Sequence, residues 1–235
     1  AEVFRVDQEI EDAFRRRLAE SGRPALLLSE EAGRVEIGGN EPEFVCVADP
    51  FDGSWLFKRR IPAFWYSSLA FYSPTFDPVC AVVGDVVAQS LSFASEAGVF
   101  RGRLEGDGLT DVVRLSVTDR EPVTDPSKAG IASYAMKPAK FLLPLVDRYR
   151  PVLEPFKFFL PNGGPDGFTN VAAGQVDVYF APGQPFVDVF SGTMIAEQAG
   201  AVVTDFAGRP IRAHDDCETV LDVVASANAD LHEQV

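Results

Sequence analysis

The chain has 235 residues and is acidic, with 35 Asp and Glu against 21 Lys and Arg and a formal net charge of −14. This balance leaves no general basic surface for nucleic-acid phosphates, so we expect no nucleic-acid polymer as a partner. Two histidines and three scattered cysteines leave little room for a disulfide framework, a Cys₄ zinc site or a histidine-based hydrolase. We therefore expect any metal ion to be a hard cation held by carboxylates.

The hydrophobic content of 46%, with 19 Phe, predicts a packed core. The longest segment without a charge or a proline, residues 63–73, is too short to cross a membrane. An odd number of cysteines fits a reducing compartment. We expect a cytoplasmic protein with no membrane partner.

The first half of the chain predicts one helix followed by strands. Apolar residues at Ile10, Phe14 and Leu18 repeat every four positions and predict a helix over 7–20. Two short apolar runs, 25–28 and 44–48, predict buried strands. A meander of strand-like runs follows, punctuated by Gly84-Asp85, at 64–72, 79–83, 86–91, 98–101 and 112–117.

Helices and strands alternate in the second half. The predicted helices are 138–149, 167–174, 188–199 and a short terminal one, and the predicted strands are a piece of 152–160, then 176–181, 201–205 and 221–226. We expect residues 1–128 to form an α+β part with metal-binding loops. Residues 129–235 would form an α/β part that completes the active site.

Three acidic groups follow apolar runs: Glu30-Glu31, the pair Asp49 and Asp52, and Asp188. Strand ends and helix starts at the edge of a sheet are where α/β proteins place ligands. A turn that aims Asp49 and Asp52 at one point brings together two carboxylates, which repel unless a cation lies between them. Taken singly, each of these acids could instead be a solvated turn or helix-cap residue without a function in binding.

Gly53 and Ser54 follow the paired aspartates and can begin a helix. The free N–H groups of a helix start bind anions such as phosphate. Cation ligands beside an anion site indicate phosphoryl chemistry with a divalent metal.

The segment A-D-P-F-D-G-S (48–54) resembles the D-P-[IL]-D-G-[ST] motif of the inositol monophosphatase superfamily. L-S-E-E (28–31) is similar to its G-E-E segment, and residues 187–210 resemble its second motif, W-D-x-A-A-G…E-A-G-G-x-x-x-D-x-x-G-x-P. The resemblance covers nearly the whole chain and implies an α/β layered fold, an αβαβα sandwich. It also implies two or three Mg²⁺ ions, with Glu30, Asp49 and the carbonyl of Phe51 on the first, Asp49, Asp52 and Asp188 on the second, and Glu31 or Glu30 assisting a third.

The resemblance further implies catalytic roles. Ser54 stands where the family has a threonine and Asp7 where its partner acid lies, so that with Glu30 they would orient an attacking water. The N–H groups of Gly53 and Ser54 would take phosphate oxygens. The substrate-binding Glu of the family falls at Ala181, and residues 162–167 replace a usual G-[ST]-A-A stretch.

The altered positions leave the organic half of the substrate open. Asp166 is a candidate replacement contact, and Arg59, in the basic run 58–60, is either a solvated side chain or an anchor for a second phosphate. We expect a Mg²⁺-dependent phosphomonoesterase acting on a small sugar or polyol phosphate, of inositol monophosphatase or fructose-1,6-bisphosphatase type. The alternatives are a 3′-phosphoadenosine 5′-phosphate nucleotidase of the same superfamily and a catalytically impaired metal-binding homologue. A homodimer or higher homo-oligomer is expected, with the aromatic residues of 64–72 in the core or at its interface.

Overall fold

The structure, a computed structural model, describes residues 5–235, and its first half forms an eight-stranded sheet. The strand order is β2-β1-β3-β4-β5-β6-β7-β8. Helix α1 (Arg5–Glu20) precedes the sheet, and the short helix α2 (Ser54–Lys58) follows its third strand. The strands are β1 (Ala25–Ser29), β2 (Gly33–Ile37), β3 (Phe44–Asp52), β4 (Tyr66–Tyr72), β5 (Pro78–Asp85), β6 (Ser90–Ser95), β7 (Gly98–Glu105) and β8 (Gly108–Arg114).

The second half forms a five-stranded sheet in the order β10-β9-β11-β13-β12. Two short 3₁₀ turns, 117–119 and 126–128, connect the sheets. The strands are β9 (Gly130–Ala132), β10 (Phe158–Leu160), β11 (Val178–Pro185), β12 (Val202–Asp205) and β13 (Val220–Ser226). The helices are α3 (Leu143–Leu153), which continues a π-helical turn (Pro138–Leu142), then α4 (Pro165–Ala172), α5 (Phe186–Gln198) and α6 (Ala229–His232).

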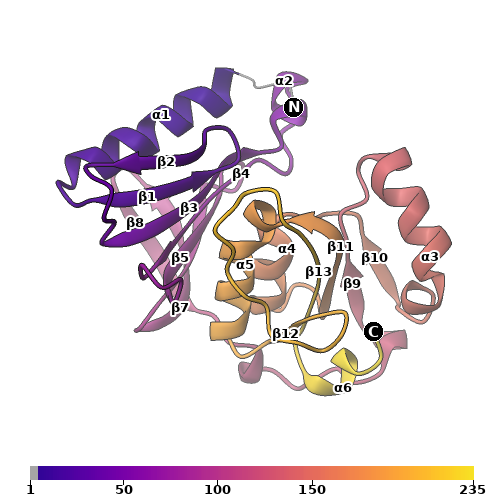
Figure 1. The fold of residues 1–235 in the computed structure, drawn as a ribbon. Helices are drawn as coiled ribbons and strands as arrows, with labels where there is room; N and C mark the ends of the chain where they lie inside the picture. The colour runs from indigo at the N-terminus through magenta and orange to yellow at the C-terminus, as the bar shows by residue number, and fades with distance from the viewer. Residues whose placement is uncertain (1–4) are drawn as a thin grey trace.

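The elements stack in five layers (Figure 1). Helix α1 covers the outer face of the large sheet, α4 and α5 lie between the two sheets, and α3 covers the far side of the small sheet. Most of α5 is buried, as a helix with a sheet on each side requires. This is the αβαβα sandwich that the sequence predicts, and the prediction of fold class is confirmed.

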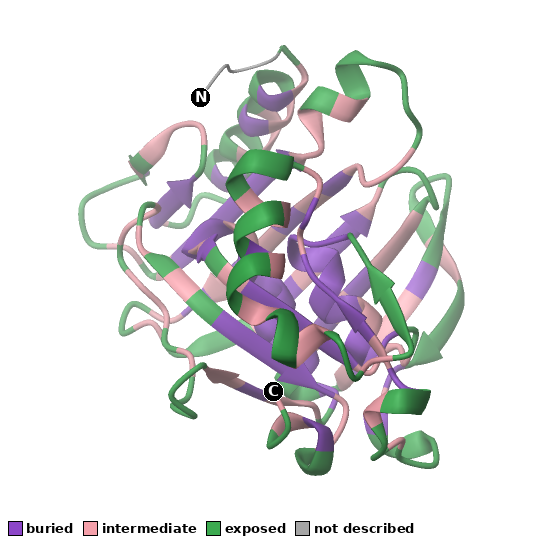
Figure 2. Cartoon of the chain, turned by 90° about the vertical axis from the view of Figure 1, so that its right-hand side faces the viewer, coloured by how far each residue is buried: buried purple, intermediate pink, exposed green. Residues whose placement is uncertain are grey.

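The core lies on both sides of α5. Phe190 and Ile195 pack with Leu28 and Val47 of the large sheet, while Val189 packs toward the small sheet. Figure 2 shows these buried elements behind α3, whose outward face is exposed. Because both faces of α5 are packed, its N-terminal turn is held at a fixed position between the sheets.

The structure corrects part of the predicted meander. Gly84 and Asp85 do not form a turn: β5 runs through both, pairing with β4 and β6. The turn lies at 86–89, where Asp85 Oδ1 accepts the N–H of Ala88 at 2.9 Å and Gln89 has a φ of 52°. The predicted strand at 86–91 is therefore wrong over most of its length, because Asp85 ends one strand and caps the turn with its side chain.

Other boundaries shift without changing the order of elements. Strand β2 has no predicted counterpart, since its alternating half-exposed residues are too polar for an apolar run. The strand expected at 112–117 lies earlier, at 108–114, because the chain turns at Gly106, whose φ is 59°. Helix α4 begins at Pro165 rather than Gly167, with proline in the first turn where its missing N–H costs nothing.

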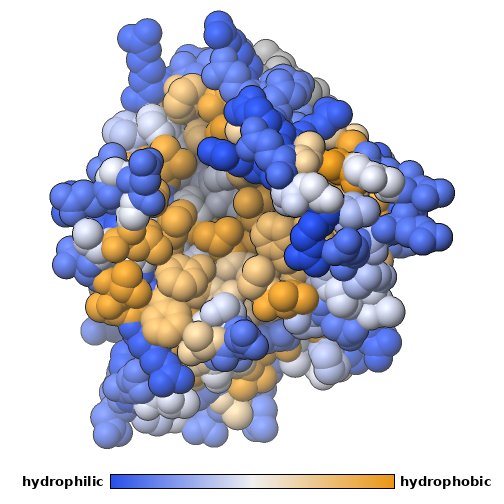
Figure 3. Space-filling model, turned by 90° about the vertical axis from the view of Figure 1, so that its left-hand side faces the viewer, coloured by the Kyte–Doolittle hydropathy of each residue, from blue (hydrophilic) through white to orange (hydrophobic). Residues whose placement is uncertain are grey.

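The outer face of the large sheet carries apolar side chains. On this face Phe93 and Phe100 stack across β6 and β7 with ring centroids 5.6 Å apart. Figure 3 views the molecule from the side of α1 and shows apolar residues gathered in the middle of that face. Among residues 5–235, no helix has both the length and the apolarity that a bilayer crossing demands.

Candidate functional site

Asp49 and Asp52 lie at the end of β3, where the strand departs from regular pairing. The register of β3 against β4 shifts between Asp49, opposite Ser68, and Asp52, opposite Tyr66. Proline cannot donate a ladder hydrogen bond, so Pro50 is tolerated at such an irregularity. The shift places both carboxylates on the side of the sheet that faces α5, with Asp49 buried and Asp52 half-buried.

Glu30 follows the neighbouring strand β1, which pairs with β3 in parallel. Its backbone N–H donates to the carbonyl of Ala48 at 3.2 Å, so Glu30 and Asp49 leave adjacent strands at the same level. The serine that replaces the family's usual glycine has a role of its own. Ser29 is fully buried, and its hydroxyl donates to the carboxylate of Glu11 on α1, which joins the helix to this edge of the sheet.

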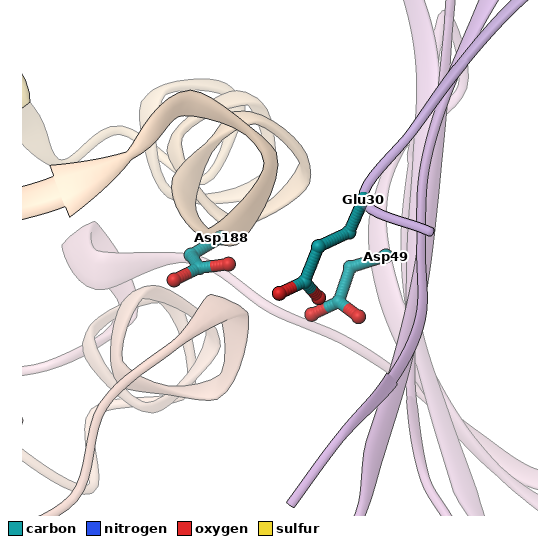
Figure 4. A group of neighbouring side chains, drawn as sticks. All are labelled: Glu30, Asp49 and Asp188. Atoms are coloured by element: carbon teal, nitrogen blue, oxygen red, sulfur yellow. The ribbon is translucent and has the colours of Figure 1, made fainter. Parts of the chain in front are cut away.

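Asp188 comes from the other half of the chain. It lies in the first turn of α5, where a negative charge is favoured by the helix dipole. Carboxylate oxygens of Glu30, Asp49 and Asp188 lie within 4.8 Å of one another. Figure 4 shows the three carboxylates pointing toward one another across the gap between the large sheet and α5. The structure thus brings together the three acidic groups that the sequence singled out.

The electrostatics of this group are those of crowded, like charges. Burial, followed by the charge of Glu30, raises the pKa of Asp49 well above its usual value. Burial, followed by the charge of Asp52, raises the pKa of Asp188 well above its usual value. Burial, then Glu30, raises the pKa of Asp52 to about 7. Desolvation and then Asp7 raise the pKa of Glu30.

A divalent cation fits this arrangement. Asp49 Oδ1 is buried and has no hydrogen-bond partner among the residues that the structure describes. A buried carboxylate oxygen without a donor is costly unless a cation or a proton satisfies it. The donors are hard oxygens, which suit Mg²⁺, Mn²⁺ or Ca²⁺ rather than a thiolate-binding metal.

Ser54 and Asp7 form a pair beside this group. The hydroxyl of Ser54 lies 2.5 Å from Asp7 Oδ1 and 2.9 Å from the carbonyl oxygen of Phe51, within donating distance of both. Asp7 is buried on α1, so its carboxylate is held in place by the helix. Gly53 precedes Ser54 with a φ of 98°, and a Cβ there would overlap the carbonyl oxygen of Phe64. Glycine is therefore required at the turn that begins α2.

The remaining predicted residues lie around this centre. Glu31 is half-buried one position after Glu30, and desolvation followed by the charge of Glu30 raises its pKa. Arg59 is exposed at the end of α2, with its guanidinium 5.2 Å from the centroid of the Trp55 ring. Asp166 is buried in the first turn of α4. Ala181, where the resemblance would place a substrate-binding glutamate, is fully buried in β11.

Lys137 belongs to the neighbourhood of the site and was not predicted. Its positive charge lowers the pKa values of Glu30, Asp52 and Asp188 against the larger effects that raise them. Its ammonium nitrogen also lies 5.9 Å from the centroid of the Tyr134 ring. A single lysine in the loop after β9 carries no motif, so nothing in the sequence marks it.

The chain is similar to known proteins over nearly its whole length. The model of the inositol monophosphatase family matches residues 1–235. The fructose-1,6-bisphosphatase of Pyrococcus furiosus is 29% identical over 231 residues, which cover 96% of this chain and 79% of the relative. The fructose-1,6-bisphosphatase/inositol-1-monophosphatase of Methanothermobacter thermautotrophicus is 26% identical over 235 residues, covering 98% and 80%.

The fold has counterparts among solved structures. A Pyrococcus horikoshii protein described as having similarities to inositol-1 monophosphatase superposes with a TM-score of 0.76 at 23% identity, covering 99% of this chain and 83% of that one. Fold, motif positions and the match over residues 1–235 agree. The chain belongs to the inositol monophosphatase family.

Proposed function

We propose that the chain hydrolyses the phosphate ester of a small sugar or polyol with two or three Mg²⁺ ions held by its carboxylates. Family membership makes the chain a phosphoric monoester hydrolase. The observation that carries the metal proposal is the convergence of Glu30, Asp49 and Asp188 within 4.8 Å, with an unpartnered oxygen of Asp49 among them. Like charges at this separation are stable together only with protons or cations between them.

The proposed ligand set extends this triad. Asp52 and the carbonyl oxygen of Phe51 are the added ligands of the main sites, and Glu31 assists a further ion. Bound there, divalent cations supply Lewis acidity that favours ionisation of an attacking water and offsets charge on the leaving oxygen. The carboxylates fix where the cations bind, because they come from a sheet and a helix packed in one core.

The remaining groups act on the water and the phosphate. Asp7 accepts the hydrogen bond that the Ser54 hydroxyl donates, so the serine oxygen can accept a hydrogen bond from the attacking water and orient it. We assign the backbone N–H groups of Gly53 and Ser54, at the turn that begins α2, to the phosphate oxygens.

The charge around the site favours a substrate with an additional anionic group. The positive charge of Lys137 lowers the pKa values of three of the carboxylates, and that of Lys140 lowers the pKa of Asp188. With Ala181 in place of the family's substrate-binding glutamate, a neutral polyol has one hydrogen-bond acceptor fewer. Fructose 1,6-bisphosphate is therefore the first substrate to test, followed by inositol 1-phosphate and 3′-phosphoadenosine 5′-phosphate.

A substrate panel tests this function. Purified protein is assayed for phosphate release from the three esters, with Mg²⁺ or with EDTA. We expect Mg²⁺-dependent release, fastest from the bisphosphorylated sugar. A protein that binds Mg²⁺ but releases phosphate from none of them favours the alternative of an impaired metal-binding homologue.

We also propose that the chain forms a homodimer. Strand β10 lies at the edge of the small sheet and, among residues 5–235, pairs with β9 alone. Its three residues, Phe158, Phe159 and Leu160, are 67%, 40% and 38% exposed. Exposed apolar edge strands are surfaces that proteins usually cover. Light scattering is expected to give twice the chain mass, and Phe158→Glu to give the mass of one chain.

A further inference from the structure

Asp166 is the centre of a buried polar network at the start of α4. It is only 9% exposed. Three side chains donate to its carboxylate: Asn162 at 3.2 Å, Thr169 at 2.9 Å and Asn170 at 2.8 Å. A carboxylate with three donors is held in one orientation.

This network reaches the large sheet through Arg101 on β7. The guanidinium donates to the hydroxyl and the carbonyl of Thr169, at 3.2 and 3.3 Å, and to the hydroxyl of Ser92 on β6 at 2.8 Å. Burial lowers the pKa of Arg101, and the charge of Asp166 is the largest effect that opposes this. The arginine and the aspartate thus compensate each other across the boundary between β7 and α4.

A second connection leads from the network to Asp52. The side-chain nitrogen of Asn162 donates to the hydroxyl of Tyr66 at 3.3 Å, and Tyr66 stands opposite Asp52 in the β3–β4 ladder. The side-chain oxygen of Asn162 accepts the N–H of Gly163 at 2.8 Å. The next residue, Gly164, lies so close to the Asp52 carboxylate that a Cβ on it would overlap Oδ2. The network therefore holds both the strand and the loop that confine this carboxylate.

Asp166 lines a different space from the acidic group. With Arg101, Asp85 and Asn170 it borders a polar cavity of about 150 Å³, to which Glu30, Asp49, Asp52 and Asp188 contribute nothing. We propose that Asp166 is a positioning residue: by fixing Asn162 and the Gly163-Gly164 loop against the large sheet, it sets the orientation of Asp52 for cation binding, and it does not contact the substrate. This rests on the proposed function in one respect, that Asp52 is a cation ligand.

The test compares Mg²⁺ binding, measured by isothermal titration calorimetry, with hydrolysis of p-nitrophenyl phosphate. Asp166→Asn removes the charge that faces Arg101 and turns an amide toward two amide donors. We expect it to weaken Mg²⁺ binding and lower kcat by about 10-fold each, as for other residues that orient metal ligands, with KM changed by less than about 2-fold. Asn162→Ala, which leaves Asp166 and Arg101 in place, is expected to reproduce both losses.

Asp177→Asn is the matched control. Asp177 is a half-buried carboxylate that accepts the N–H of Gly130 at 2.8 Å within the small sheet. The Asp177→Asn substitution should lower the melting temperature without changing the affinity for Mg²⁺. If Asp166→Asn and Asn162→Ala also lose only thermal stability, the positioning role is overturned. Wild-type protein that binds Mg²⁺ but releases no phosphate counts against the proposed function alone, because the titrations still compare the variants.

Discussion

The hydroxyl of Ser54 connects three parts of the proposed site in a few ångströms. The hydroxyl contacts Asp7 on α1 and the carbonyl oxygen of Phe51 near the end of β3. Ser54 is also the first residue of α2. A threonine at this position, as in the family motif, adds only a methyl group. We therefore expect the proposed chemistry to depend on the hydroxyl oxygen and to tolerate either serine or threonine.

Two substitutions of Ser54 test whether the hydroxyl oxygen or the residue type matters. Ser54→Ala removes the oxygen that we propose orients the water. General acid–base groups of this kind contribute about 100-fold, so we expect a loss in kcat of that order. Ser54→Thr should remain within a few-fold of wild type. Steady-state phosphate release measures both. An alanine variant with more than half of the wild-type rate would show that the hydroxyl has no part in catalysis.

The residues of the site differ in how far the sequence could predict them. Asp49, Asp52 and Gly53 lie within six residues of one another, so local spacing alone revealed them. That these residues would lie close to Asp188 could be expected only from the resemblance to the family motif. Arg101 and Lys137 could not be predicted, because each acts through contacts with residues far away in sequence and neither belongs to a local pattern.

At the scale of elements, the packing of α4 against α5 decides where both helix starts lie. Gly192 on α5 lets the helices approach closely: a Cβ there would stand 2.6 Å from the Phe168 ring and 2.7 Å from the carbonyl oxygen of Pro165. Gly164 and Asp188 lie at the beginnings of these helices. The distance between the helices is therefore coupled to the geometry of the site.

Gly192→Ala tests this packing. Alanine favours a helix over glycine by about 1 kcal/mol, but the backbone oxygen of Pro165 cannot move aside as a flexible side chain can. We expect overpacking to prevail, with a net loss of about 1–3 kcal/mol in the free energy of unfolding. Chemical denaturation measures it, with Gly108→Ala as control, since a Cβ there meets its nearest atom at 4.0 Å. A stabilised Gly192→Ala protein would contradict the close packing.

Most elements could be predicted from apolar periodicity, because each has a buried face. The failures lie where burial is partial. The first four residues of β2 alternate between half-exposed and exposed, and Ile37 at its end is buried. The turn at 86–89 contains two valines that resemble a strand in sequence. The side chain of Asp85 accepts a hydrogen bond within this turn and so stabilises it despite the valines. Apolar periodicity does not reveal such a contact.

At the scale of the whole molecule, the acidic group should make the metal-free protein less stable as pH rises. The pKa values of Glu30, Asp49, Asp52 and Asp188 are raised by folding, and that of Asp52 reaches about 7. A carboxyl with a raised pKa contributes its stability below the unfolded pKa and loses it as pH rises through the folded one. Glu11, Glu31 and Glu197, whose pKa values burial also raises, act in the same direction. His232, whose pKa burial lowers, acts in the opposite direction.

The expected result is a melting temperature in EDTA that falls from about pH 5 to about pH 8, and that Mg²⁺ restores at the upper end. Asp52→Asn should flatten the dependence. Thermal scans monitored by circular dichroism, at constant ionic strength, measure it. A melting temperature in EDTA that stays level or rises over this range would show that the four carboxyls do not share one crowded site.

The most direct test of a carboxylate-held metal site is the rate of phosphate release by wild type and Asp49→Asn as Mg²⁺ is varied. Asparagine keeps the shape of Asp49 and removes the charge at the centre of the group. We predict release that EDTA abolishes in wild type and a loss of about 100-fold or more in Asp49→Asn at saturating Mg²⁺. Asp77→Asn, in an exposed turn, should match wild type. Phosphate release that persists in EDTA and in Asp49→Asn would contradict the proposed mechanism.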